Sequence, residues 1–128
     1  MGFRLGTRSR NNLKGVHPDL LRVVERAIQK TKQDFTVIEG VRTMQRQREL
    51  VAKGASKTFN SRHLTGHAVD IVPFPIPRNW KDYKKTQWTK IYKAMKEAAA
   101  ELNIEMDHGY DWGWDKPHHQ LDWEKYPK

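Results

Sequence analysis

The sequence predicts an α+β domain in which helices flank a small, mainly antiparallel sheet, and three observations lead to this prediction. Residues 18–32 and 89–102 place apolar side chains at the spacing of one helix face. Short segments such as residues 35–39 are rich in β-branched residues or alternate in polarity, as strands do. The predicted helices and strands do not follow the regular strand-helix-strand rhythm that builds a parallel sheet.

In the first half of the chain we expect an arm, a helix, a strand and a second helix. Residues 1–15 are basic and show no periodic pattern, so the arm should be irregular. The helix over residues 18–32 has Pro18 in its first turn, where proline is tolerated. Its apolar face comprises Leu20, Leu21, Val24, Ala27 and Ile28. Residues 35–39 should form a strand, and residues 43–53 a helix that ends before a glycine.

In the second half, short strands should surround one long helix. We expect, in order, a polar loop over residues 55–60, a strand over 67–72, a helix over 89–102, and strands over 104–106 and 118–123. A loop containing glycine and tryptophan, residues 109–117, should separate the last two strands. A chain of 128 residues has the length of one ordinary domain, so we expect residues 1–128 to form a single domain.

The composition limits the chemistry open to the chain. There is no cysteine, which excludes disulfides, thiolate zinc sites and cysteine nucleophiles, so a bound metal must be held by His, Asp or Glu. Lys and Arg number 24 against 15 Asp and Glu, which gives a formal charge of +9. Such a charge attracts nucleic acids, anionic envelope polymers and anionic membranes alike, and does not choose among them.

Hydropathy predicts where the protein is made. The first 15 residues are basic but lack the apolar stretch of a secretory signal, and no apolar run is long enough to span a bilayer. We therefore expect a soluble protein made in the cytoplasm, without a transmembrane segment, and a monomer by default.

The most informative segment is SRHLTGHAVDI, residues 61–71. Asp70 follows Val69 in an apolar strand, where an unpaired carboxylate is costly and needs a partner. A metal ion is one such partner. His63 lies seven residues earlier, across a turn at Gly66, and can return to the same metal because zinc accepts both imidazole and carboxylate.

These residue types and this spacing also allow arrangements without such a metal site. Asp70 could pair with an arginine, and His63 could be a solvated loop residue. His63 and His67 are also four residues apart, the spacing of the histidines in helical HExxH zinc peptidases. Gly66 and the alternating pattern argue against such a helix, and Leu64 stands where that motif has its catalytic glutamate.

A second polar cluster lies in WGWDKPHHQLDW, residues 112–123. Strand alternation places His118, Gln120 and Asp122 on one face and His119, Leu121 and Trp123 on the other. Spacing alone allows either histidine to be a ligand. A catalytic zinc takes three protein ligands, keeps a position for water and needs a nearby carboxylate as general base. Asp115 is the candidate base.

Together these clusters resemble the motifs of the zinc D,D-peptidases and L-alanyl-D-glutamate endopeptidases, the VanX/VanY-like family. The first motif, Ser-x-His-x-x-Gly-x-Ala-x-Asp, is met at Ser61, His63, Gly66, Ala68 and Asp70. The second motif, an acid followed three residues later by a histidine, is met by Asp115 and His118. The form Trp-Asp-x-Pro-His resembles the phage endolysin branch of the family, which favours His118 over His119.

The resemblance implies a zinc site on one face of the sheet, with one Zn²⁺ per chain. The implied ligands are His63, Asp70 and His118. It also implies that Asp115 is the base that activates water. The segment IEGVRT resembles the family's strand-to-helix junction, whose arginine is here Arg42. Arg42 would polarise the scissile carbonyl or stabilise the oxyanion, and Ser61 would contact the substrate.

By the same resemblance, the chain is an endolysin that cuts the stem peptide of bacterial peptidoglycan, at the L-alanyl-D-glutamate bond. The D-alanyl-D-alanine peptidases of the family commonly carry Glu where Asp115 stands, so the aspartate favours this specificity. Such a lysin would remain in the host cytoplasm until a membrane hole releases it to the periplasm and cell wall. The alternatives are a D-alanyl-D-alanine carboxypeptidase on the same site and a non-catalytic, zinc-containing binding module. No specific nucleic acid is expected as a partner.

The tryptophans and the last helix do not require a special function. Core packing is the first expectation for Trp80, Trp88, Trp112, Trp114 and Trp123. Trp112 and Trp114 adjoin Asp115, however, and could instead line the substrate groove. The basic side of the helix over residues 89–102 could lie on an anionic surface, although such sides are more commonly solvated.

Overall fold

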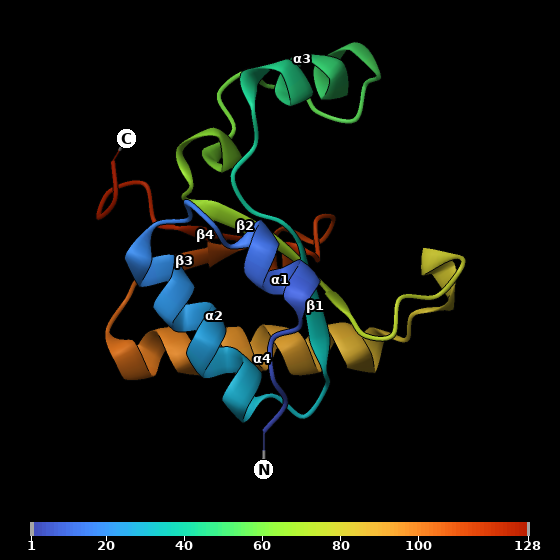
Figure 1. Cartoon of the computed structure of the whole chain (residues 1–128), viewed down its shortest axis with the longest axis vertical. Helices are drawn as coiled ribbons and strands as arrows, with labels where there is room; N and C mark the ends of the chain where they lie inside the picture. The colour runs from blue at the N-terminus through green and yellow to red at the C-terminus, as the bar shows by residue number, and fades with distance from the viewer. Residues whose placement is uncertain (1, 128) are drawn as a thin grey trace.

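A four-stranded antiparallel sheet forms the centre of the computed structural model, which describes residues 2–127 (Figure 1). Its strands are β1 (Phe35–Glu39), β2 (Ala68–Pro73), β3 (Met106–His108) and β4 (His118–Leu121). They lie in the order β1-β2-β4-β3, and each neighbouring pair is antiparallel. The α+β class and the antiparallel sheet are therefore confirmed, and β2 and β4 are the central strands.

Two long helices cover the sheet and supply most of the core. These are α2 (Pro18–Lys30) and α4 (Lys85–Leu102), which pack against each other, and α4 also contacts β2 and β3 (Figure 1). Helix α2 begins where the sequence predicts because His17 Nδ1 accepts a hydrogen bond from the Asp19 amide and Pro18 occupies the first turn. The fully buried core side chains include Leu20, Val23, Val24, Val37, Val69, Ile71, Met95 and Leu121.

Helix α3 (Met44–Ala52) stands away from this core, at the top of the view in Figure 1. The Thr43 hydroxyl caps its start by accepting a hydrogen bond from the Arg46 amide. Gln47 is its single buried residue. The helix therefore contributes a polar side chain, and not an apolar face, to the rest of the molecule.

The N-terminal arm is not irregular as expected, because Thr7–Asn12 form helix α1, which packs on β1. Ser9 Oγ accepts a hydrogen bond from the Val37 amide at 2.9 Å, and Asn12 Nδ2 donates one to the Val37 carbonyl at 2.9 Å. These two side chains form hydrogen bonds with the backbone of β1 along its outer edge, where no neighbouring strand lies. A contact across 25 or more residues leaves no periodic pattern in the arm itself.

Several boundaries also differ from the expected ones. Strand β3 begins two residues later than predicted and ends where a short helix, α5 (Gly109–Trp112), occupies part of the expected loop. Short 3₁₀ helices cover Arg62–Thr65 (η1) and Trp80–Asp82 (η2). The hydroxyl of Tyr92, on α4, donates to Asp111 Oδ1 at 2.5 Å, so α5 is held by a helix distant in sequence. Between residues 2 and 127, no helix combines the length and apolar character that crossing a membrane requires.

Candidate metal centre and active site

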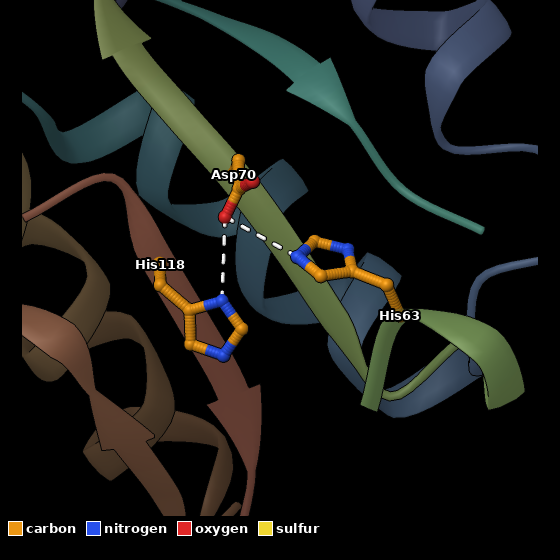
Figure 2. A group of neighbouring side chains, drawn as sticks. All are labelled: His63, Asp70 and His118. Atoms are coloured by element: carbon orange, nitrogen blue, oxygen red, sulfur yellow. Dashed lines mark hydrogen bonds and ion pairs between the residues drawn. The ribbon is translucent and has the colours of Figure 1, made fainter. Parts of the chain in front are cut away.

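Three separate elements bring His63, Asp70 and His118 together (Figure 2). Asp70 and His118 are direct partners in the antiparallel pairing of β2 with β4, so their side chains lie on the same face. The amide of Ile71 also donates to the Pro117 carbonyl at 2.9 Å, which extends this register. His63 lies on η1, and the turn at Gly66, with a φ of 76°, returns the chain from η1 to β2.

The side chains converge as metal ligands do. His63 Nε2 and His118 Nδ1 each lie 3.3 Å from Asp70 Oδ1, and the three potential ligand atoms all lie within 4.8 Å of one another. His63 Nε2 is buried yet makes no hydrogen bond with any group in the described chain. A buried nitrogen without a partner, facing a carboxylate and a second imidazole, fits a bound cation.

The far nitrogen of each imidazole is fixed by an acceptor. His63 Nδ1 donates to the Gly40 carbonyl at 2.9 Å, and His118 Nε2 donates to Gln120 Oε1 at 2.7 Å. With a metal bound and both rings neutral, each donation would leave the lone pair of the other nitrogen, on the side that faces Asp70, free for the metal. The two acceptors therefore favour the tautomer that a metal requires.

Electrostatics keep Asp70 ionised in this group. Burial raises the pKa of the Asp70 carboxyl, but the hydrogen bond with His118 and the neighbouring His63 outweigh it, so its pKa lies well below the ordinary value. Burial lowers the pKa of His118, but its hydrogen bond to Asp70 reverses this, and the net shift is upward. An ionised carboxylate in this position is ready to bind a cation.

The other two histidines of the motifs lie elsewhere. His119 points to the opposite side of β4, is buried, and has its Nδ1 2.8 Å from His108 Nδ1. His67 has its Nδ1 2.6 Å from the Thr65 hydroxyl, and its ring lies beside His17. The 3₁₀ helix η1 ends at Thr65, so no helix carries His63 and His67 on one face.

Asp115 lies at the start of the chain segment that leads into β4. Its carbonyl accepts a hydrogen bond from the His118 amide at 3.1 Å, and its half-buried carboxyl is close enough to interact electrostatically with Asp70, His63 and His118. Burial raises the pKa of Asp115, and the charge of Asp70 adds to the increase while the neighbouring cations oppose it. A carboxyl with a raised pKa beside the candidate metal site suits proton transfer.

Arg42 approaches the same centre from the β1 side. Its guanidinium donates to Glu39 and, at 2.7 Å, to Gln47 Oε1, and its Nη2 lies 3.9 Å from Asp70 Oδ2. Ser61 Oγ lies 3.5 Å from Arg42 Nη1 and accepts a hydrogen bond from the His63 amide at 3.2 Å. The side chain of Arg42 is 9% exposed, so its charge is held in one place.

Comparison with known proteins identifies the family of this chain. A family model described as phage L-alanyl-D-glutamate peptidase matches residues 1–125. The chain belongs to this family. It is 34% identical over 116 residues to the L-alanyl-D-glutamate peptidase of Escherichia phage T5, covering 88% of this chain and 83% of that protein. The crystal structure of the Serratia marcescens L-Ala D-Glu endopeptidase ChiX superimposes with a TM-score of 0.87 at 42% identity, covering 99% of this chain and 96% of that one.

Within this phage peptidase fold, Gln47 is a residue that the sequence motifs do not reveal. It is fully buried on α3, accepts from Arg42, and donates to Ser56 Oγ at 2.9 Å and to the Thr58 carbonyl at 2.5 Å. It thereby links Arg42 to the loop over residues 55–60. A glutamine in a polar helix carries no local signal of burial, so no feature of the sequence pointed to it.

The tryptophans do not form a core cluster. Trp80, Trp112, Trp114 and Trp123 are 48%, 41%, 75% and 41% exposed, so the expectation of core packing is wrong for these four. The rings of Trp112 and His118 have centroids 5.4 Å apart, and those of Trp112 and Trp114 are 5.8 Å apart. This pair therefore extends outward from the candidate metal centre.

Proposed function

We propose that this member of the phage peptidase family is a zinc-dependent endopeptidase that hydrolyses the L-alanyl-D-glutamate bond of bacterial peptidoglycan. The observation that carries the proposal is the convergence of His63, Asp70 and His118, with the buried Nε2 of His63 left without a hydrogen bond in the described part of the chain. The names of the T5 and Serratia relatives supply the bond.

The donor set supports zinc as the metal. Two imidazole nitrogens and one carboxylate oxygen are ligands of catalytic zinc sites, and the chain has no thiolate that would favour a structural one. When bound, zinc supplies Lewis-acid polarisation of the scissile carbonyl and lowers the pKa of water. We infer one ion per chain, held by His63, Asp70 and His118.

The protein side chains around the metal would move the protons. Asp115 accepts a proton from the attacking water and then gives it to the leaving amine, a role for which its raised pKa suits it. Arg42, fixed by Glu39 and Gln47, holds a permanent positive charge beside the site and stabilises the negative charge that develops on the carbonyl oxygen. Ser61 would contact the substrate while its oxygen orients the His63 backbone.

The family match supports a proposal for where the reaction takes place. We propose a monomer that acts on peptidoglycan after leaving the host cytoplasm through a membrane hole, with the positive charge of +9 helping it remain on anionic envelope polymers. None of the features described calls for a specific nucleic acid.

Two measurements on the purified protein test the proposal. Elemental analysis without chelator should find about one zinc per chain. Mass spectrometry of purified peptidoglycan after digestion should find new amino-terminal D-glutamate and L-alanine left on the muramyl group. Release of D-alanine instead would identify a carboxypeptidase, and a protein that retains zinc but releases nothing would be a binding module. Full activity of a zinc-free protein in chelator would contradict the metal assignment.

A further inference from the structure

We propose that Trp112 and Trp114 form the subsite for the sugar end of the substrate, the N-acetylmuramyl group attached to L-alanine. This inference rests on the proposed function and adds an orientation to it. The sugar would lie on the β4 side of the metal centre, and the anionic remainder of the stem peptide on the β1 side.

The position and exposure of the two indoles support a binding role. The Trp112 ring lies 5.4 Å from the ring of the candidate ligand His118, and Trp114 continues the surface outward with 75% of its area exposed. Exposed aromatic pairs beside a catalytic centre are uncommon unless they bind something. The C–H bonds on a pyranose face carry a weak positive charge, so they pack favourably on the negative face of an indole.

The helix that carries Trp112, α5, is held in place by α4. Tyr92 donates to Asp111 and its ring stacks on Tyr110, with centroids 4.2 Å apart. The hydroxyls of Tyr110 and Thr89 are 2.9 Å apart. These contacts hold α5, and with it Trp112, against α4, so less entropy is lost when a ligand binds there.

Charge distinguishes the two sides of the metal centre. In the sheet, β1 and β4 flank β2. Arg42, which follows β1, lies beside Asp70 and donates to Gln47 on α3, whereas the Trp112 ring lies beside His118 of β4. Residues 44–58, which include α3, expose Arg46, Arg48, Lys53 and Lys57 against the single carboxylate of Glu49. Residues 109–117 carry two aspartates and one lysine.

The substrate has the complementary asymmetry. On the amino side of the L-alanyl-D-glutamate bond, L-alanine is joined to the uncharged lactyl ether of muramic acid. On the carboxyl side, D-glutamate and the diamino acid that follows carry free carboxylates. The basic β1 side therefore suits the peptide and the aromatic β4 side suits the sugar.

A pair of soluble substrates tests the subsite. One is N-acetylmuramyl-L-alanyl-D-glutamyl-lysine, and the other carries acetyl in place of the N-acetylmuramyl group. Wild type should prefer the muramyl peptide. For the muramyl peptide, Trp114→Ala should raise the KM so that kcat/KM falls about 3- to 10-fold, the size of an aromatic packing contribution. For the acetyl peptide, the loss of kcat/KM should be much smaller. Trp114→Phe should recover part of the preference, and Trp80→Ala, an exposed tryptophan on η2, should keep all of it.

Binding without hydrolysis separates this inference from the proposed function. Titration of the metal-loaded protein with N-acetylmuramyl-L-alanine should shift the indole N–H resonances of Trp112 and Trp114 but not that of Trp80, and acetyl-L-alanine should shift neither. Equal losses on both substrates in Trp114→Ala, or no shift at these two indoles, would overturn the subsite. Clear shifts in a protein that cuts neither peptide would support the subsite and refute the proposed bond.

Discussion

Two carboxyl groups in one site, Asp70 and Asp115, have pKa values displaced in opposite directions. Both are affected by burial, which raises a carboxyl pKa, but Asp70 also accepts a hydrogen bond from His118 and faces His63. For Asp115 burial remains dominant. A carboxylate that stays ionised is a good ligand, and one that holds its proton more tightly is a good acid and base near neutral pH. The surroundings thus favour different roles for the same side chain.

The Asp→Asn substitution at each position tests this division. Asp115→Asn should keep the zinc but lower the hydrolysis rate by about 10²–10⁴-fold, because the proton acceptor is lost while the ligands remain. Asp70→Asn should lose zinc and folding stability together, because a ligand anion is removed. Bound zinc, peptidoglycan hydrolysis and thermal unfolding should be measured for both. An Asp115→Asn protein without metal, or with metal and full activity, would contradict the assignment.

The adjacent histidines of β4, His118 and His119, allow a second test of the ligand assignment. His118→Ala should abolish zinc retention, because its Nδ1 faces Asp70. His119→Ala should retain zinc but lower the free energy of unfolding by about 1–3 kcal/mol, the cost of leaving the buried partner His108 unsatisfied. Zinc content and urea unfolding should be measured for both variants, to show which histidine binds the metal. Loss of zinc from His119→Ala with the fold intact would show that the two roles are reversed.

The residues of the candidate site were predictable to different degrees. The three ligand candidates lie in motifs whose spacing is local, and the family resemblance favoured His118 over His119. The strand register that pairs Asp70 with His118 is a tertiary contact that the sequence did not predict. Gln47, which fixes Arg42, and the Gly40 carbonyl, which orients His63, act through contacts between distant segments. The residue types at these positions do not predict such contacts.

The same distinction holds for the secondary structure elements. Helix α2 and strand β1 were predicted because a proline start, an apolar face and a β-branched run are local signals. Helices α1 and α5 were missed because tertiary hydrogen bonds support them: Ser9 and Asn12 pair with β1, and Asp111 with Tyr92. Neither has the length or periodicity that would make it a helix by itself.

Helix α5 also supports the proposed base through a close backbone contact. A Cβ atom at Gly109 would lie 1.9 Å from the Asp115 carbonyl oxygen and 3.0 Å from the Asp115 Cβ, so Gly109→Ala must displace Asp115. We expect the variant to retain zinc and to lose most of its hydrolysis rate, because general-base catalysis depends on position. The rate and the zinc content should be measured together.

Gly113→Ala is the matched control in the same segment. Its φ of 86° makes alanine strained by about 1–2 kcal/mol, but nothing lies within 4 Å of the added methyl. It should lower stability while leaving hydrolysis largely intact. If the two variants lose the same share of activity, general strain in the segment, and not displacement of Asp115, is the cause.

At the scale of the whole molecule, the basic residues 44–58 and the indoles of Trp112 and Trp114 lie on opposite sides of the candidate metal centre. Strand β2 supplies Asp70 at the middle, β1 leads to Arg42 and α3, and β4 supplies His118. The family match over residues 1–125 covers all of these elements. This arrangement cannot be predicted from the order of the strands along the chain, because β4 lies between β2 and β3 in the sheet.

The net charge predicts how lysis depends on salt. With 24 Lys and Arg against 15 Asp and Glu, attraction to an anionic envelope should be strong at low ionic strength. It should fade as the screening length shortens from about 10 Å at 0.1 M salt to about 3 Å at 1 M. The rate of lysis of purified envelopes should therefore fall as salt rises. Hydrolysis of the soluble muramyl peptide, which meets the site without a polyanionic surface, should change far less.

Removing positive charge away from the site provides the control for this salt effect. Lys90 and Lys93 are exposed on α4, and replacing both with Gln should lower lysis at low salt and flatten its salt dependence, because fewer charges act on the envelope. Hydrolysis of the soluble peptide by this variant should equal that of wild type. If salt slows the soluble and envelope reactions equally, the salt acts on the catalytic centre itself, and the surface charge has no part in holding the enzyme on the wall.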